Sequence, residues 1–256
     1  MRENAERFAL EMTNTLRLVS ADDSQSFNAA LSKNKQGKYR VSVSSDSGFP
    51  LCDTGKTVFL LEARWSFVSG SSIDWMRAES SAFAVFSTLT AKAPLFRYEF
   101  STNHGFKIPE AHIHFHGHED GNLGMERVGP IKETLSHTGE NSKRARKRGR
   151  EANDPTKRQP QVSDLHFPVG GTRFRPVLED ILLMLIEEYG IDTTMSVDDV
   201  TAQLHSQVFE WRKKQLASAI RDMPEVALST IEDMGFSVVP PPTGISEGRK
   251  DRFTKR

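Results

Sequence analysis

The sequence predicts an α+β fold, in which an antiparallel sheet carries a histidine-rich strand, one helix lies between strands, and a group of helices ends the chain. In the first half, segments alternate apolar and polar residues with a period of two, as half-buried strands do. After Pro176 the apolar residues recur at helical spacing between capping signals. Strands first and helices last are typical of α+β rather than doubly wound proteins.

The first half, over residues 5–137, is expected to be mainly β. An amphipathic helix is predicted over 72–89, because its apolar residues are spaced by three and four. Strands are predicted from alternation or β-rich composition over five segments, which are 10–18, 39–43, 57–61, 95–100 and 111–116.

The second half is expected to be helical. A first helix starts near Pro176, has acidic residues in its first turn, and ends at Gly190. A second helix opens at Ser196, whose hydroxyl is a favoured N-cap, and a third at Pro224.

Two polar stretches divide the chain. Residues 138–161 are rich in Lys and Arg and are predicted to form a flexible basic linker, and residues 240–256 a disordered basic tail. The material between them, 162–239, is read as a strand followed by helices. It either shares the core of residues 5–137 or forms a second one.

Composition excludes several classes of protein. The chain has 256 residues, 34 basic and 34 acidic side chains, and no run of apolar residues long enough to cross a membrane. The single cysteine, Cys52, cannot form an internal disulfide or a thiolate zinc site, and we interpret it as a packed small residue. We therefore expect a cytoplasmic protein that does not interact with membranes.

Four of the eight histidines occupy alternate positions near the end of the predicted strand 111–116. Because successive side chains of a strand point to opposite faces, the four rings are expected to share one face, with Ile113 and Phe115 toward the core. The histidines are His112, His114, His116 and His118.

Three chemistries fit this pattern, against the simpler interpretation of a solvated polar face. Histidines two residues apart on a strand can bind Zn²⁺, Fe²⁺ or Mn²⁺, with Glu119, Asp120 or His166 completing the shell. Without metal, histidine can cleave RNA as general acid and base, since both protonation states are populated near neutral pH. A histidine can also attack phosphorus as a nucleophile.

Other residues are expected to support this site. Arg97 on the preceding strand and Arg173 and Arg175 before the first C-terminal helix could stabilise phosphate charge. A strand around His166 could pair beside the histidine strand and bring that ring into the cluster. The basic linker offers further phosphate-binding groups, which are Lys143, Arg144 and Arg146.

Two segments together resemble TumE-like toxins of bacterial toxin–antitoxin pairs. An Arg-aromatic-acid strand from Phe96 precedes a loop histidine and the histidine-rich strand, and later come Leu165-His166-Phe167-Pro168 and a Leu-Glu-Asp helix. The resemblance implies a small α+β toxin domain acting on RNA, with an antitoxin as partner. The best corresponding positions are Arg97, His104, His112 and His114.

The run from His112 to His116 also resembles the motif of the histidine triad nucleotide hydrolases. That likeness implies that His114 attacks the α-phosphate of a nucleotide while His112 and His116 assist. Gly117 and His118 depart from the motif, which has two apolar residues there.

The sequence thus predicts an RNA-cleaving, toxin or phage-defence type of protein, with catalytic residues His112, His114, His116, Arg97, His104 and His166. The alternatives are a metal-dependent enzyme with His112, His114, His116 and His118 as ligands, a histidine-triad-like hydrolase, and a non-catalytic protein that binds nucleic acid or a partner.

Overall fold

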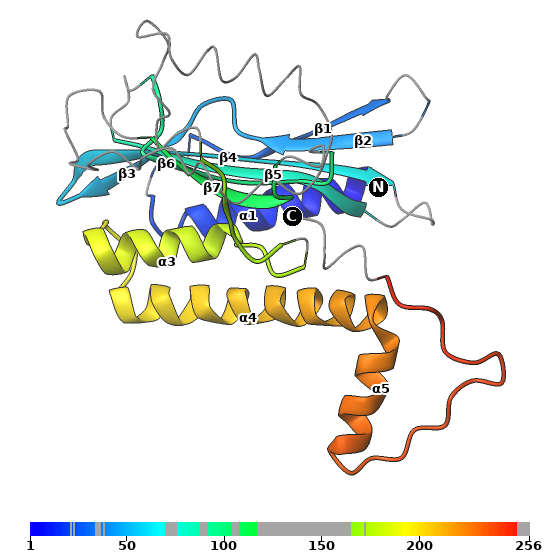
Figure 1. The fold of residues 1–256 in the computed structure, drawn as a ribbon. Helices are drawn as coiled ribbons and strands as arrows, with labels where there is room; N and C mark the ends of the chain where they lie inside the picture. Colours follow the sequence, from blue (N-terminus) through cyan, green and yellow to red (C-terminus); the bar gives the residue numbers. More distant parts are fainter. Residues whose placement is uncertain are drawn as a thin grey trace, which may run out of the picture.

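The computed structural model describes most of the chain outside one long internal stretch. The described residues are 1–20, 22, 24–33, 37, 39–69, 76–87, 92–103, 108–116, 165–171 and 173–249. They form an antiparallel sheet with helices on one side, which confirms the α+β class (Figure 1).

The eight strands pair antiparallel throughout, and seven of them follow one another in the order β1-β2-β4-β5-β6-β7-β8. The remaining strand, β3, pairs with the first half of β4, whereas β2 pairs with its second half. Their bounds are β1 Asn28–Lys33, β2 Tyr39–Ser44, β3 Phe49–Asp53, β4 Lys56–Ser69, β5 Met76–Phe86, β6 Phe96–Ser101, β7 Ala111–Phe115 and β8 Phe167–Pro168. The sheet therefore ends on strands from both sides of residues 117–164.

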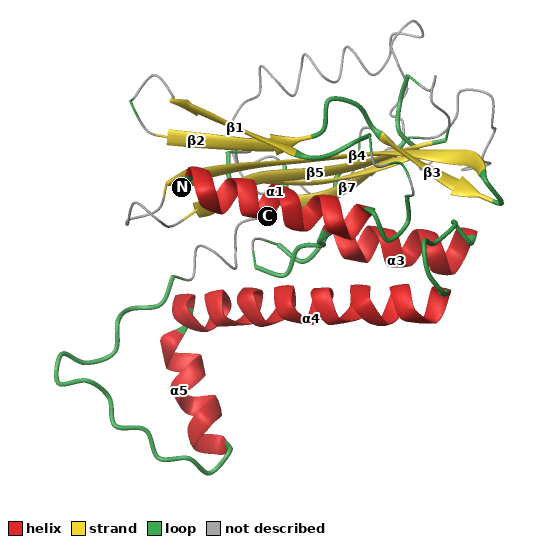
Figure 2. Ribbon diagram, turned by 180° about the vertical axis from the view of Figure 1, so that it is seen from behind, coloured by secondary structure: helices red, strands yellow, loops and turns green. Residues whose placement is uncertain are grey.

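Helices cover one face of the sheet in two layers. Figure 2 shows α1 and α3 directly against the strands, with α4 running beyond α3. The bounds are α1 Arg2–Leu16, α3 Leu178–Tyr189, α4 Val197–Asp222 and α5 Pro224–Asp233. A single apolar core joins strand residues such as Leu61 and Val85 to helix residues such as Leu182 and Leu204. Strands before residue 117 and helices after residue 164 thus contribute to one core.

The strand predicted over 10–18 is wrong, because α1 occupies Arg2–Leu16. Leu10, on which the alternation depended, is 57% exposed. The residues that α1 buries, including Ala5, Phe8 and Met12, recur at spacings of three and four instead. The Phe8 ring packs edge-on against two aromatic rings of β4.

The helix predicted over 72–89 is also wrong, because Met76–Phe86 forms β5 in the middle of the sheet. Phe83 and Val85 face the helices, while Ala82 and Ala84 are buried on the opposite face. A strand that is covered on both faces reads as an unbroken apolar run, and its alternation disappears. Residues 70–75 and 88–91 lie outside the described part.

The remaining expected strands, 39–43, 57–61, 95–100 and 111–116, coincide with β2, β4, β6 and β7 to within one residue or lie inside them. Ser196 caps α4 by accepting the Asp199 amide proton, Gly190 ends α3 with a positive φ of 65°, and Pro224 stands in the first turn of α5. The first C-terminal helix begins at Leu178, two residues after Pro176. The basic linker 138–161 and residues 250–256 lie outside the described part.

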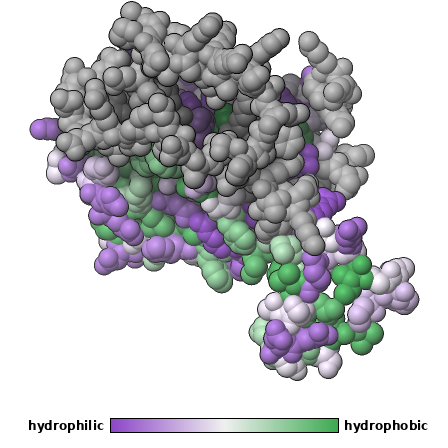
Figure 3. All heavy atoms as spheres, viewed as in Figure 1, coloured by the Kyte–Doolittle hydropathy of each residue, from purple (hydrophilic) through white to green (hydrophobic). Residues whose placement is uncertain are grey.

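The last helix, α5, turns away from the body of the molecule (Figure 1). None of its side chains is buried. Apolar side chains gather on this arm, as Figure 3 shows, among them Val226 at 46% exposure and Met234, just beyond α5, at 68%. Of the helices that the structure describes, none combines the length and the apolar character that crossing a membrane requires.

The hairpin between β3 and β4 turns through Thr54 and Gly55, which have positive φ values of 49° and 74°. Two successive positive φ values are those of a type I′ turn, which favours Asn-Gly. The Asp192 carboxylate accepts hydrogen bonds from both backbone amides, at 2.9 and 2.7 Å. This contact fastens the hairpin to the loop after α3.

Replacing Thr54 by Asn is expected to raise the free energy of unfolding by about 0.5–1 kcal/mol, because a β-branched residue is strained at positive φ and Asn is not. Urea denaturation would measure the change. The control Thr54→Val keeps the β-branch and should be no more stable than the wild type. An equal gain in both variants would contradict the explanation by backbone conformation.

Candidate metal centre

Strand alternation on β6 and β7 places charged and imidazole side chains together. In the antiparallel register Arg97 lies opposite His114, and Glu99 lies opposite His112. Their neighbours in sequence, including Phe100 and Ile113, are buried on the helix side. The polar residues therefore gather on the face of the sheet that the helices leave uncovered.

The short strand β8 brings His166 into the same cluster, as the sequence predicted. Pro168 of β8 pairs with His112 of β7. The His166 ring centre lies 5.0 Å from that of His112 and 4.2 Å from that of His114. One ring nitrogen of each of the three histidines lies within 4.8 Å of the other two.

The cluster is buried, which distinguishes it from a solvated polar face. His112 is 1% exposed and His114 is 6% exposed, while His166 is half-buried. Phe115, which the sequence predicted to face the core, is 42% exposed and packs beside Phe167. Burial of three imidazoles demands specific polar partners, because an unsatisfied ring nitrogen in a low-dielectric interior is costly.

The orientation of His112 is fixed by the backbone. Its Nδ1 lies 2.7 Å from the carbonyl oxygen of Pro109. Since a carbonyl oxygen only accepts, Nδ1 carries a proton, and Nε2 is the nitrogen directed at Glu99. A carbonyl partner of this kind is the usual device that orients a metal-binding histidine.

A carboxylate lies at the centre of the cluster. Glu99 Oε2 is 3.4 Å from His112 Nε2 and 3.5 Å from His114 Nε2. The hydrogen bond with His112 and the positive charge of Arg97 outweigh the opposing effect of burial and lower the pKa of Glu99 to about 2. Glu99 is therefore ionised, and its Oε2 lies among ring nitrogens that can serve as metal ligands once they are deprotonated.

His116 follows β7 and stacks against His114, with ring centres 6.1 Å apart. Burial, aided by the positive charge of Arg97, lowers the pKa of His116, which favours the neutral ring. Its Nε2 is buried and has no hydrogen-bond partner among the residues that the structure describes. His116 thus adds an unpartnered ring nitrogen next to the cluster.

A polar groove of about 370 Å³ runs along the same face of the sheet and reaches Arg97. Arg64 also lines it, together with Asp46 and Ser45 from the turn before β3. Arg97 Nε lies 3.1 Å from Glu99 Oε1, and this nitrogen is buried without an aligned hydrogen bond among the described residues. The groove therefore contains two arginines, of which Arg97 lies opposite His114 of the cluster.

Other residues predicted for the site are not brought together with it. Arg173 pairs with Asp222 of α4, and Arg175 lies over the Phe100 ring, so both are on the helix side of the sheet. The remaining predicted site residues lie outside the described part of the chain, and they are His104, His118, Glu119, Asp120, Lys143, Arg144 and Arg146.

Sequence reasoning missed Glu99 as a member of the site. Its position two residues after Arg97 and on the strand before the histidines carried the signal, but only the register of β6 with β7 sets it opposite His112. The Pro109 carbonyl was also missed, because backbone groups leave no mark on the sequence pattern.

The donor set fits a transition metal. Imidazole nitrogens with one carboxylate are typical ligands of Zn²⁺, Fe²⁺ and Mn²⁺, at about 2.0–2.2 Å from the ion. Nitrogens bound to one tetrahedral ion are about 3.3 Å apart, so the three rings would close in by small rotations from their present spacing. Comparison of the chain with family models, with curated proteins and with solved structures gives no match.

Proposed function

We propose that His112, His114 and His166 bind a divalent transition metal next to Glu99, and that the protein is a metal-dependent hydrolase of phosphoesters. The observation that carries the proposal is the convergence of three histidine nitrogens within 4.8 Å of one another, beside a half-buried carboxylate. The side chains come from β6, from β7 and from the segment just before β8. His166 is more than 50 residues from the other two histidines in the sequence.

A cation would fit the arrangement of these groups. Glu99 Oε2 lies 3.4 Å from His112 Nε2 and 3.5 Å from His114 Nε2, so the carboxylate and the ring nitrogens converge on one small region. A metal ion bound there would displace the proton that His112 Nε2 shares with Glu99 and would be held by the nitrogen lone pairs of the buried rings. The Pro109 carbonyl would serve as the second-layer partner that such sites need.

The groove supports an anionic substrate. Arg97 and Arg64 line it on the same face as the histidines, and guanidinium groups bind phosphate oxygens through paired hydrogen bonds. A bound metal would supply an activated water and polarise the phosphoryl oxygen. RNA, the substrate class favoured by the sequence, is a polymer of such phosphodiesters and remains our proposal for the natural substrate.

Cleavage by histidines without metal is the competing proposal, and it uses the same residues. It requires one ring to accept a proton and another to donate one. Since both proposals depend on His112 and His114, only the metal dependence of the reaction separates them.

The purified, untagged protein, incubated with Zn²⁺, Mn²⁺ or Fe²⁺ and dialysed, is expected to retain close to one metal ion per chain. The variants His114→Ala and His166→Gln each remove a ligand and should retain little metal. Elemental analysis by plasma mass spectrometry measures the content. The second variant is at a half-buried position and perturbs packing less than the first.

The matched control is His205→Ala, because His205 is exposed on α4, remote from the cluster. It should bind as much metal as the wild type. Absence of metal from the wild type under all three conditions, or its retention in both ligand variants, would exclude the metal centre.

The metal-loaded protein is expected to hydrolyse the model diester bis(p-nitrophenyl) phosphate. Arg97→Gln should lower kcat/KM by about 100-fold, since a donor aimed at developing phosphate charge is lost, while the metal content stays unchanged. Release of p-nitrophenolate gives the rate, and Arg221→Gln on α4 is the control. A rate that persists in a chelator would favour cleavage without metal, and no rate would refute the hydrolase proposal.

A further inference from the structure

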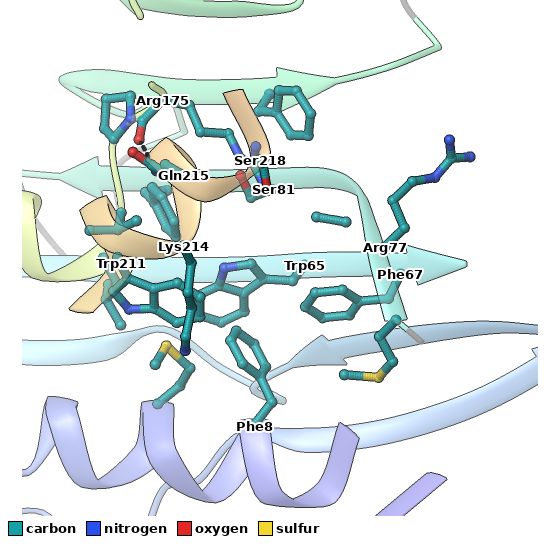
Figure 4. A pocket seen from close by; sticks show the side chains of 18 of the residues that line it. Phe8, Trp65, Phe67, Arg77, Ser81, Arg175, Trp211, Lys214, Gln215 and Ser218 are labelled. Atoms are coloured by element: carbon teal, nitrogen blue, oxygen red, sulfur yellow. Dashed lines mark hydrogen bonds between the residues drawn. The ribbon is translucent and has the colours of Figure 1, made fainter. Parts of the chain in front are cut away.

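A second cavity, of about 270 Å³, lies on the helix side of the sheet, between β4–β6, α1, the start of α3 and the middle of α4 (Figure 4). It is separated from the histidine cluster by the thickness of the sheet. The neighbouring residues Glu99 and Phe100 of β6 face the cluster and this cavity respectively. The cavity takes no part in the proposed metal chemistry.

The walls of the cavity are aromatic. Trp65 of β4 and Trp211 of α4 line it with Phe8 and Phe67, and Figure 4 shows these four aromatic side chains among those drawn around the cavity. Phe8 lies edge-on to Trp65, Phe67 and Trp211, with ring centres 5.3, 5.1 and 6.2 Å away. Such a set of rings offers faces and edges to a flat apolar molecule.

Positive charge reaches the cavity from two sides. Arg175 sits over the Phe100 ring, with its guanidinium carbon 4.0 Å from the ring centre, and its backbone oxygen accepts a hydrogen bond from Gln215. Burial lowers the pKa of Arg175 to about 10, which still leaves it charged at neutral pH. Lys214 adds a second cation, 4.1 Å from the centre of the Trp211 ring.

Among the described residues that line the cavity, Glu179 is the one acidic residue, and it is 1% exposed. Its Oε1 accepts the indole proton of Trp211 at 3.0 Å, while its Oε2 is buried and has no hydrogen-bond partner within the described ranges. Burial raises the pKa of Glu179, which favours the neutral acid. The carboxyl group therefore offers polar capacity that the protein itself does not use.

We propose that this cavity binds a small, flat aromatic molecule with a carboxylate group. The rings of Trp65 and Trp211 would hold the aromatic part and Arg175 the carboxylate, while Glu179 Oε2 could hydrogen-bond a further polar group. The volume lies just below the range of typical ligand sites, roughly 300–1,000 Å³, and accommodates a fused pair of rings rather than a larger cofactor.

The test compares 2-naphthoate with its neutral isostere 2-naphthamide on the full-length protein by isothermal titration calorimetry. The wild type should bind naphthoate at least 10-fold more tightly than naphthamide. Arg175→Gln should abolish that preference by weakening naphthoate alone. Quenching of tryptophan fluorescence on titration would place either ligand near the indoles.

Two further variants keep the test decisive. Ser218→Trp places a bulky ring in the cavity from α4 and keeps the Arg175 residue itself, and it should lose both ligands. Arg221→Gln is the charge control, because Arg221 is exposed on α4 and does not line the cavity, and it should bind as the wild type does. No naphthoate binding by the wild type, or equal naphthoate binding by the wild type and Arg175→Gln, would overturn the proposal.

Discussion

The central constraint on this molecule is the register of β5, β6 and β7, whose side chains alternate between the helix face of the sheet and the face of the histidine cluster. On β6, Phe96, Tyr98 and Phe100 face the helices, whereas Arg97 and Glu99 face the other way. A slip of one residue in register would bury Glu99 in the apolar core and expose its aromatic neighbours. The apolar packing of the helix face therefore also determines where the polar cluster forms.

The histidine face could be predicted from sequence because it depends only on period-two alternation within one strand, and His166 could be predicted from the short apolar run around it. Glu99 could not, because its place opposite His112 depends on pairing between two strands. The prediction of a strand at α1 was wrong because Leu10, which completed the alternating pattern, is exposed. The prediction of a helix at β5 was wrong because Ala82 and Ala84 are buried on the second face, so the strand shows no alternation of apolar and polar residues. Patterns within a segment report only its own periodicity, whereas pairing and two-sided burial are tertiary properties.

The two faces of the sheet handle buried charge in opposite ways. On the polar face, Glu99 is ionised because imidazole and guanidinium groups surround it. On the helix face, Glu179 meets mainly aromatic rings, and burial favours its neutral form. The same residue type is thus suited to holding a cation on one side and to hydrogen-bonding a neutral or anionic ligand on the other.

The three clustered histidines come from opposite sides of residues 117–164, since His112 and His114 precede that stretch and His166 follows it. An ion held by all three would act as a crosslink between distant parts of the chain, as a disulfide does. Closing a loop costs only about 0.6 kcal/mol more for each doubling of its length. Insertions or deletions between His114 and His166 would therefore add little to the cost of closing the loop. The length of the chain between the ligands can vary in evolution while the geometry of the cluster is kept.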